Sequence, residues 1–284
     1  MNAPPFPANP TFGQFFGNWV WSGSRWVCTN TNGIRIVTQV FRASGPYTPS
    51  PGLVSCVVET IGGGGSGGAV LSTPSATAIL SGGGGGSGGY SRVALASGLV
   101  LGGVNVIIGA GGDAQTTQPG GVTSFGAFCV SNGGNPGLDN AASSQYFGGS
   151  GSGAAPGVGD VAYAGAPGHC GVAVIYPTFL DTNAQGGMGG WVFGGNVVVD
   201  TGPAAYNEGA PCWPNTGAGG VGGCANQIAP PIGIVYGGAG GSGICIVTEY
   251  CWADAIDDGC GCGPTGQARV AYAGSPQGYG FDND

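Results

Sequence analysis

The chain contains no lysine and very little charge of either sign. Five arginines are its only basic residues apart from one histidine, against 13 acidic residues in 284, and the formal net charge is −8. A chain without a basic stripe cannot follow a phosphate backbone, which excludes nucleic-acid binding. A P-loop, which requires a lysine, is excluded as well.

Long apolar runs are also missing. No run approaches the roughly 18 residues that a membrane-spanning helix needs, so we expect no membrane insertion. The N-terminus, Met-Asn-Ala-Pro-Pro-Phe-Pro, does not have the charged-then-apolar layout of a signal peptide. No convincing amphipathic helix is present, because the glycine and proline background makes any long helix unfavourable.

Catalytic constellations are equally scarce. Ser66 and Ser87 fit the pattern G-x-S-x-G, but a nucleophile elbow needs a following helix and a histidine base, and His169 is the one histidine. The pattern G-x-G-x-x-G also occurs, without the βαβ unit that binds dinucleotides. Glu59, Glu208 and Glu249 are too isolated to indicate paired catalytic carboxylates. We expect no enzyme activity and no cofactor.

A metal site is not predicted either. No C-x-x-C motif occurs, and one histidine supplies little for zinc. Asp254, Asp257 and Asp258 cluster near the C-terminal end, where carboxylates could hold calcium, but their spacing does not fit an EF-hand loop. We interpret them as a solvated acidic loop.

Glycine is what the chain has in abundance, with 66 glycines arranged in blocks beside 20 prolines. The longest blocks are GGGGSGG at 62–68 and GGGGGSGG at 82–89. Disorder normally combines low hydrophobicity with high charge, whereas this chain is 42% hydrophobic with a mean hydropathy of +0.20. An ordered state is favoured: a bundle of polyproline-II-type helices whose backbones bond to one another. The alternative is flexible loops of a β-sandwich.

The ten cysteines are even in number and scattered, which favours a disulfide framework over a metal site. Buried thiols are the alternative. Cys245 and Cys251 are predicted to share one strand and one face, too far apart to bond each other. The disulfide candidates are Cys28, Cys56, Cys129, Cys170, Cys212, Cys224, Cys245, Cys251, Cys260 and Cys262.

Short β-branched runs with turn signals between them predict an all-β fold, a jelly-roll-like β-sandwich combined with the glycine-rich helix bundle and with few or no α-helices. Expected strands are 34–42, 53–61, 77–80, 92–96, 104–108, 123–130, 171–176, 191–200, 232–236, 244–250 and 268–273. A turn is expected at 44–52.

Three regions are expected along the chain. Residues 1–33 form an aromatic attachment segment, 34–252 the glycine-rich β-domain, and 253–284 an acidic, cysteine-containing tail packed on that domain. Residues 18–28 read as a small hairpin, which cannot fold well alone and should dock on another surface. Its region supplies the candidates for attachment or oligomer contact: Phe12, Phe15, Phe16, Trp19, Trp21 and Trp26.

An ordered series of motifs resembles the glycine-rich domain of bacteriophage tail-fibre and receptor-binding proteins. FRASGPYTPSPGLV (41–54) and VVETI (57–61) precede the first glycine block, SGGGGGSGGYSRVALASG follows at 81–98, and GGVTSFG at 120–126. GGAGGSGICIVTEY at 237–250 resembles the closing strand. The similarity covers about residues 20–250. The ten cysteines and the segment 251–284 depart from the pattern.

The resemblance implies a virion structural protein, often trimeric, assembled in the host cytoplasm and extracellular after lysis. Its partners would be other virion proteins, reached through the N-terminal segment, and a host-surface glycan or protein. A capsid decoration or head-fibre protein is the main alternative. An extracellular ice-binding or cell-wall protein is a third, although the regular threonine-lined face that it predicts is not found.

Aromatic residues in turn-rich segments are the candidates for ligand binding, because exposed rings suit recognition of polysaccharides or surface proteins. Packing in the core or between subunits is the alternative. The first choice is the loop 200–216. The candidates are Trp191, Tyr206, Trp213, Tyr279 and Phe281.

Overall fold

A computed structural model describes the backbone of residues 11, 14–16, 19–21, 26–28, 34–71, 80–141, 148–175, 180–183, 206–225, 233–252 and 269–272. Within these residues the fold is all-β, as the sequence predicts, and its one helical element is a 3-10 turn at Ser97–Leu99. Pairing between strands is antiparallel with a single exception, described below.

The largest sheet has six strands and contains the longest strands of the molecule. β6 (Leu53–Ile61) and β17 (Ile244–Trp252) pair antiparallel at its centre. β8 (Tyr90–Ala96) and then β12 (Val161–Tyr163) extend it on one side, and β4 (Ile34–Phe41) and β18 (Arg269–Tyr272) on the other. β18 pairs with β4 in parallel.

A four-stranded sheet covers the inner face of the larger one. Its order is β11 (Cys129–Ser131), β10 (Thr123–Phe125), β9 (Val104–Ile107) and β5 (Gly45–Tyr47). The main hydrophobic core lies between the two sheets, because alternate residues of every long strand face inwards. Tyr47 and Phe125 meet there edge to face, with ring centroids 5.0 Å apart.

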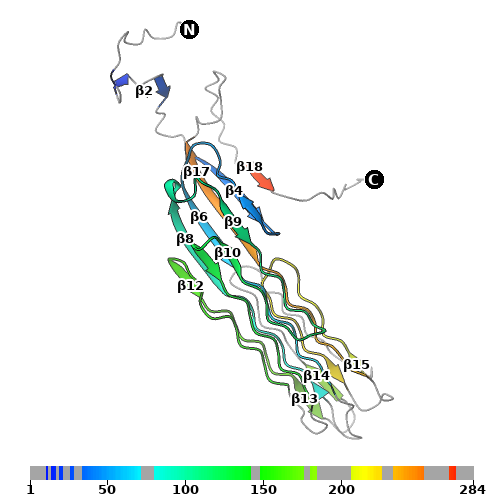
Figure 1. Cartoon of the computed structure of the whole chain (residues 1–284). Coiled ribbons are helices and arrows are strands. Elements are labelled where there is room, and N and C mark those ends of the chain that lie inside the picture. Colours follow the sequence, from blue (N-terminus) through cyan, green and yellow to red (C-terminus); the bar gives the residue numbers. More distant parts are fainter. Residues whose placement is uncertain are drawn as a thin grey trace, which may run out of the picture.

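Glycine segments continue the strands beyond both sheets and give the molecule a rod-like shape. Segment 62–70 follows β6, segment 82–89 precedes β8, and segment 235–243 precedes β17. Figure 1 shows these extensions running side by side, away from the sheets and towards the opposite end. The neighbouring strands β6, β8 and β17 therefore continue into three glycine segments of the other half of the molecule.

Hydrogen bonds of segment 62–70 repeat every third residue, whereas a β-strand repeats every second. Three sets of N–H groups donate to three different neighbouring segments. The donor–acceptor pairs are Gly62–Gly89, Gly65–Gly86 and Gly68–Gly83; Gly63–Gly121 and Ser66–Gln118; Gly64–Gly241, Gly67–Gly238 and Val70–Val235. The carbonyls of Gly63, Ser66 and Ala69 accept from a fourth segment, 134–140, at the same spacing.

Close packing of backbones explains why these positions are glycine. A Cβ added to Gly64 would overlap the carbonyl of Ala218, and one added to Gly67 would overlap the carbonyl of Val221. The same holds at Gly83 and Gly86 in the second block. The missing side chains thus let neighbouring backbones hydrogen-bond directly on several sides.

Short strands close the far end of the glycine segments and also form a separate unit near the N-terminus. The far-end sheets are β15–β16–β7, made of Tyr206–Asn207, Cys224–Ala225 and Leu80–Ser81, and β13–β14, made of Val172–Ile175 and Leu180–Asn183. The N-terminal sheet is β1 (Phe15–Phe16), β2 (Trp19–Trp21) and β3 (Trp26–Cys28). The hairpin predicted for residues 18–28 is confirmed.

Most expected strands among the described residues are confirmed, with three differences. The strand expected at 232–236 is not found: in its described part, 233–236, only Val235 forms an isolated bridge, to Val70. The run 123–130 is two antiparallel strands, because Gly126 has a φ of +52° and reverses the chain. The turn expected at 44–52 begins with strand β5, in which Pro46 lies on an edge strand, where no ladder hydrogen bond requires its N–H. The expected strands at 77–80 and 191–200 lie wholly or mostly outside the described residues.

Candidate functional site

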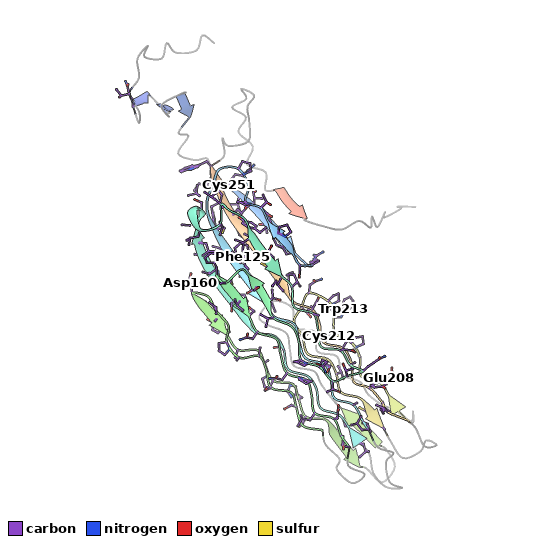
Figure 2. All side chains as sticks on the ribbon, viewed as in Figure 1. Phe125, Asp160, Glu208, Cys212, Trp213 and Cys251 are labelled. Carbon is purple, nitrogen blue, oxygen red and sulfur yellow. The ribbon has the colours of Figure 1, made fainter. Side chains whose placement is uncertain are left out.

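Trp213 is the most exposed large hydrophobic side chain among the described residues, with 72% of its surface accessible. It lies in the loop between β15 and β16, part of the segment that sequence analysis ranks first for ligand binding. Figure 2 shows it beside Cys212 on one flank of the rod, where the sheets give way to the glycine segments. A ring of this size in open solvent is available for contact with another molecule.

The loop that carries Trp213 is held by hydrogen bonds on both sides of the ring. Cys212 N–H donates to the Ala239 carbonyl at 2.9 Å, and Asn215 N–H donates to Ser242 Oγ at 2.9 Å. Thr216 Oγ1 donates to the carbonyl of Trp213 itself at 2.7 Å. The backbone beneath the indole is thus fixed, which lowers the entropy lost when a partner binds.

Two residues of this loop have left-handed backbone angles, which let the chain turn tightly. Asn215 has a φ of +64°, and Gly217 has the same value. Asparagine tolerates this region better than other side chains, and glycine enters it freely. Asn215 Oδ1 is buried without a hydrogen-bond partner, so the loop leaves one acceptor unsatisfied beside the exposed ring.

The structure does not bring the other four ligand-binding candidates to Trp213. Trp191, Tyr279 and Phe281 lie outside the described residues. Tyr206 belongs to β15, of which the structure describes the backbone only. Trp213 is therefore the one candidate whose side chain can be evaluated.

Five of the six attachment candidates belong to the small N-terminal sheet. Phe15 pairs with Val20, Phe16 with Trp19, and Trp21 with Trp26. The structure describes the backbone of these strands, and Phe12 lies outside the described residues. A sheet with strands of two and three residues is too small to bury an apolar face by itself.

The expected disulfide framework is not found where it can be checked. No disulfide joins any of the seven cysteines whose side chains the structure describes: Cys56, Cys129, Cys170, Cys212, Cys224, Cys245 and Cys251. Four of them, Cys56, Cys129, Cys245 and Cys251, occupy the main core as small apolar side chains. The disulfide prediction is therefore wrong for these seven cysteines, and burial as apolar side chains accounts for four of them. Cys28, Cys260 and Cys262 have side chains outside the described part.

Strand assignments for two of the cysteines are confirmed. Cys245 and Cys251 both belong to β17 and are both completely buried, so they share its inner face. Burial raises the pKa of the Cys56 thiol to about 11 and that of the Cys129 thiol likewise to about 11. These thiols are protonated at neutral pH and are poor nucleophiles.

The two serines of the G-x-S-x-G patterns are not accessible. Ser66 and Ser87 are both fully buried among glycine segments. Ser87 Oγ accepts a hydrogen bond from Ala166 N–H at 2.8 Å, and Ser66 Oγ has no partner. Neither hydroxyl can reach a substrate, in agreement with the compositional origin of both patterns.

A buried carboxylate is the feature that sequence analysis missed. Glu249 is completely buried in β17 and accepts three hydrogen bonds: from Tyr47 Oη at 2.7 Å, Ser50 N–H at 3.0 Å and Ser50 Oγ at 2.6 Å. Alternation with Cys245, Val247 and Cys251 could have placed this glutamate inside. Its partners are not predictable, because they come from residues about two hundred positions earlier. We assign Glu249 a structural role.

A scan of the sequence against protein-family models gave no match, and neither did a search of curated proteins. In the part of the chain that the structure describes, no three histidine, cysteine, aspartate or glutamate side chains gather closely enough to hold a metal ion. No helix in the same part has the length and apolarity to cross a bilayer.

Proposed function

We propose that the chain is a non-enzymatic structural protein of a bacteriophage virion, a tail fibre or receptor-binding adhesin that contacts the host surface. The observation that carries the proposal is the Trp213 loop, a fixed backbone that holds a large ring in solvent on the flank of a rod. Its ligand would be a glycan or protein of the host cell. The motif series in the sequence supports the assignment to a virion.

The glycine segments, in this proposal, are polyproline-II-type helices, and the two sheets form a jelly-roll-like sandwich. The three-residue repeat of hydrogen bonds supports the helix assignment, since such a helix has three residues per turn and makes no hydrogen bonds within itself. Bonds on several sides of each segment would make the rod stiff. A stiff rod suits display outside a cell, where it must keep a binding surface away from the particle.

Assembly as a homotrimer would give such an adhesin avidity. An apolar patch on the outer face of the six-stranded sheet, where β4 begins and β17 ends, supports self-association. Ile34 and Ile36 are exposed there, next to Trp252, which is 58% exposed and pairs with Ile34. No charged residue among the outward-facing positions of β4 and β17 interrupts this face in the described part. The N-terminal aromatic sheet would then attach to other virion proteins.

Two measurements test the proposed function. Immunogold electron microscopy with antibody to this chain should label tails or fibre tips of intact particles. Labelling of the capsid would favour the decoration role, and particles without label would contradict the virion assignment.

The second measurement is binding of the purified full chain to host cells. Trp213→Ala should weaken binding at least ~10-fold, because a central tryptophan typically contributes 2 kcal/mol or more. Leu101→Ala is the matched control, since Leu101 is also exposed but lies in the Ser97–Gly103 turn region. Equal binding by both variants would remove Trp213 from the site.

A further inference from the structure

A compact cluster of aromatic and charged side chains occupies one corner of the six-stranded sheet. Glu59 of β6 lies directly across from Arg92 of β8, and Tyr90 of β8 lies across from Tyr163 of β12. Their neighbours in sequence, Thr60 and Ser91, are completely buried, so strand alternation directs the cluster to the outer face. Glu59 and Arg92 are the two charged residues among the outward-facing positions of this sheet whose side chains the structure describes.

The aromatic part of the cluster is held in place without a ligand. Tyr90 Oη donates to Glu59 Oε1 at 2.5 Å. The rings of Tyr90 and Tyr163 are stacked, with centroids 6.3 Å apart and planes inclined by 24°. Tyr163 is 48% exposed, so one ring of the pair remains open to solvent. Burial, and then the bond to Glu59, raises the pKa of Tyr90, which keeps its hydroxyl a donor at all physiological pH values.

The edge of the sheet is fixed at this corner as well. Asp160, just before β12, accepts a hydrogen bond from Ala94 N–H of β8 at 2.9 Å. A side chain at Gly159 would meet the backbone of Arg92, so the turn before β12 lies against β8. Figure 2 places Asp160 on the flank opposite Trp213. The cluster is therefore separate from the Trp213 loop.

The chemistry of the cluster selects among ligand classes. A quaternary ammonium ion would use the tyrosine rings and Glu59, but Arg92 next to them opposes a cation. An anion would use Arg92, but Glu59 and Asp160 oppose it. A neutral ring with an apolar face and hydroxyls at its rim fits all the groups: the face packs on tyrosine, and the hydroxyls pair with the carboxylate and the guanidinium.

We propose that Tyr90, Tyr163, Glu59 and Arg92 form a binding site for a neutral hexopyranose unit of a polysaccharide. Tyr163 supplies the stacking surface, and Tyr90, tied to Glu59, supports it from behind. Glu59 accepts from sugar hydroxyls, and Arg92 donates to them. The site does not depend on Trp213, so it can be present whether or not that loop is the adhesive one.

Saturation-transfer difference NMR on the full chain tests the site. The probes are the methyl glycosides of glucose, galactose, mannose and N-acetylglucosamine, with tetramethylammonium and inorganic phosphate as the other two ligand classes. We expect saturable binding of at least one glycoside with a Kd of roughly 1–10 mM, the weak range typical of a single contact unit. Binding of tetramethylammonium or phosphate without any glycoside would overturn the proposal, and so would the absence of binding by all the probes.

Variants separate stacking from polar contacts and from folding. Tyr163→Ala should reduce glycoside affinity at least ~10-fold, and Tyr163→Phe should retain most of it, because the ring remains. Arg92→Gln, a milder change on an exposed side chain, should reduce affinity ~5-fold or more. Trp213→Ala should bind like the wild type, which distinguishes this site from the proposed adhesive loop. Loss of binding by Trp213→Ala with full binding by Arg92→Gln and Tyr163→Ala would overturn the assignment.

Discussion

The glycines of segments 62–68 and 82–89 other than Gly84 lie against the backbone of a neighbouring segment, so the absent side chain sets the spacing between segments. The neighbour is a carbonyl in most cases, and the N–H groups of the same segments donate to other carbonyls nearby. A methyl group at such a position would push two backbones apart and break hydrogen bonds beyond its own contact. Gly45, Gly98 and Gly102 carry no such constraint, because nothing lies within 4 Å of a Cβ added there.

Gly67→Ala should destabilise the fold by at least about 3 kcal/mol, the upper end of overpacking effects, because a rigid carbonyl blocks the added carbon. Gly102→Ala is the matched control, since nothing lies within 4 Å of its added Cβ. Its stability should stay within ~1 kcal/mol of wild type. Urea unfolding of both variants measures the difference, and equal stability would contradict close packing at Gly67.

Glu249→Gln should lower the free energy of unfolding by about 2 kcal/mol, because hydrogen bonds to a charged acceptor are replaced by neutral ones. The carboxylate ties Tyr47 and Ser50 to β17. The exposed Glu208 is the control, and Glu208→Gln should change stability by less than ~0.5 kcal/mol. Thermal unfolding compares the two. A stability of Glu249→Gln equal to wild type would mean that the buried network contributes nothing.

At the scale of elements, three strands carry thiols into the core between the sheets. Cys56 belongs to β6, Cys129 to β11, and Cys245 and Cys251 to β17. Cys129 Sγ lies 3.3 Å from Thr60 Oγ1, so even these small side chains take part in contacts between sheets. Ionising such a thiol inside the core would place a charge where water cannot reach it.

Stability should therefore decrease as pH rises between about 9 and 11. The folded state keeps the Cys56 and Cys129 protons up to a pKa of about 11, whereas the unfolded chain releases them near 9. The folded state binds more protons in this window, so raising the pH favours unfolding. Urea midpoints measured at neutral pH, pH 9 and pH 11 give the slope. Cys129→Ala should flatten it.

Cys170 provides the control for that measurement, because it is exposed. Cys170→Ala should leave the pH slope unchanged. A wild-type midpoint that stays constant up to pH 11 would contradict the buried state of these thiols.

At the scale of the whole molecule, we expect the glycine-rich half to unfold cooperatively, because its segments are hydrogen-bonded to several others at once. Segment 62–70 bonds to segments that begin near residues 82, 118, 134 and 235, so its neighbours come from across the chain. No segment can leave without breaking bonds in several others. Closing such distant contacts makes folding slow, and it also makes local opening unfavourable.

Native-state hydrogen exchange should show this cooperativity. The amides of Gly62–Gly68 and Gly82–Gly89 should be among the slowest in the chain, because each donates to a neighbouring segment. Gly98 and Gly102, outside the glycine segments, should exchange much faster. Mass spectrometry of peptic fragments measures both sets. Fast exchange in the two glycine segments would contradict an ordered bundle.

The sequence could predict where most strands lie but not which strands pair with one another. Alternation in 53–61 and 244–250 places β6 and β17 correctly, because side-chain period depends on the local chain. The pairing of β17 between β4 and β6 involves residues far apart in sequence. The split of 123–130 at Gly126 was missed because a positive φ at one glycine has no distinct sequence pattern.

The candidate sites divide in the same way. Trp213 could be chosen from sequence because an aromatic ring in a proline-rich turn tends to be exposed. The second site could not be chosen from sequence. It depends on the pairing of β12 with β8, which brings Tyr163 opposite Tyr90, and no local pattern predicts that pairing. The cysteines were wrongly favoured as disulfide partners where they can be checked, because cysteine count carries no information on burial.

The sequence by itself determined that this protein is all-β, poor in charge and dependent on glycine, because those properties follow from composition and local period. Tertiary structure decided which backbones meet at each glycine, which carboxylate is buried and which side chains share a face. Those outcomes depend on hydrogen bonds and contacts between segments many residues apart, and no local pattern encodes such partners.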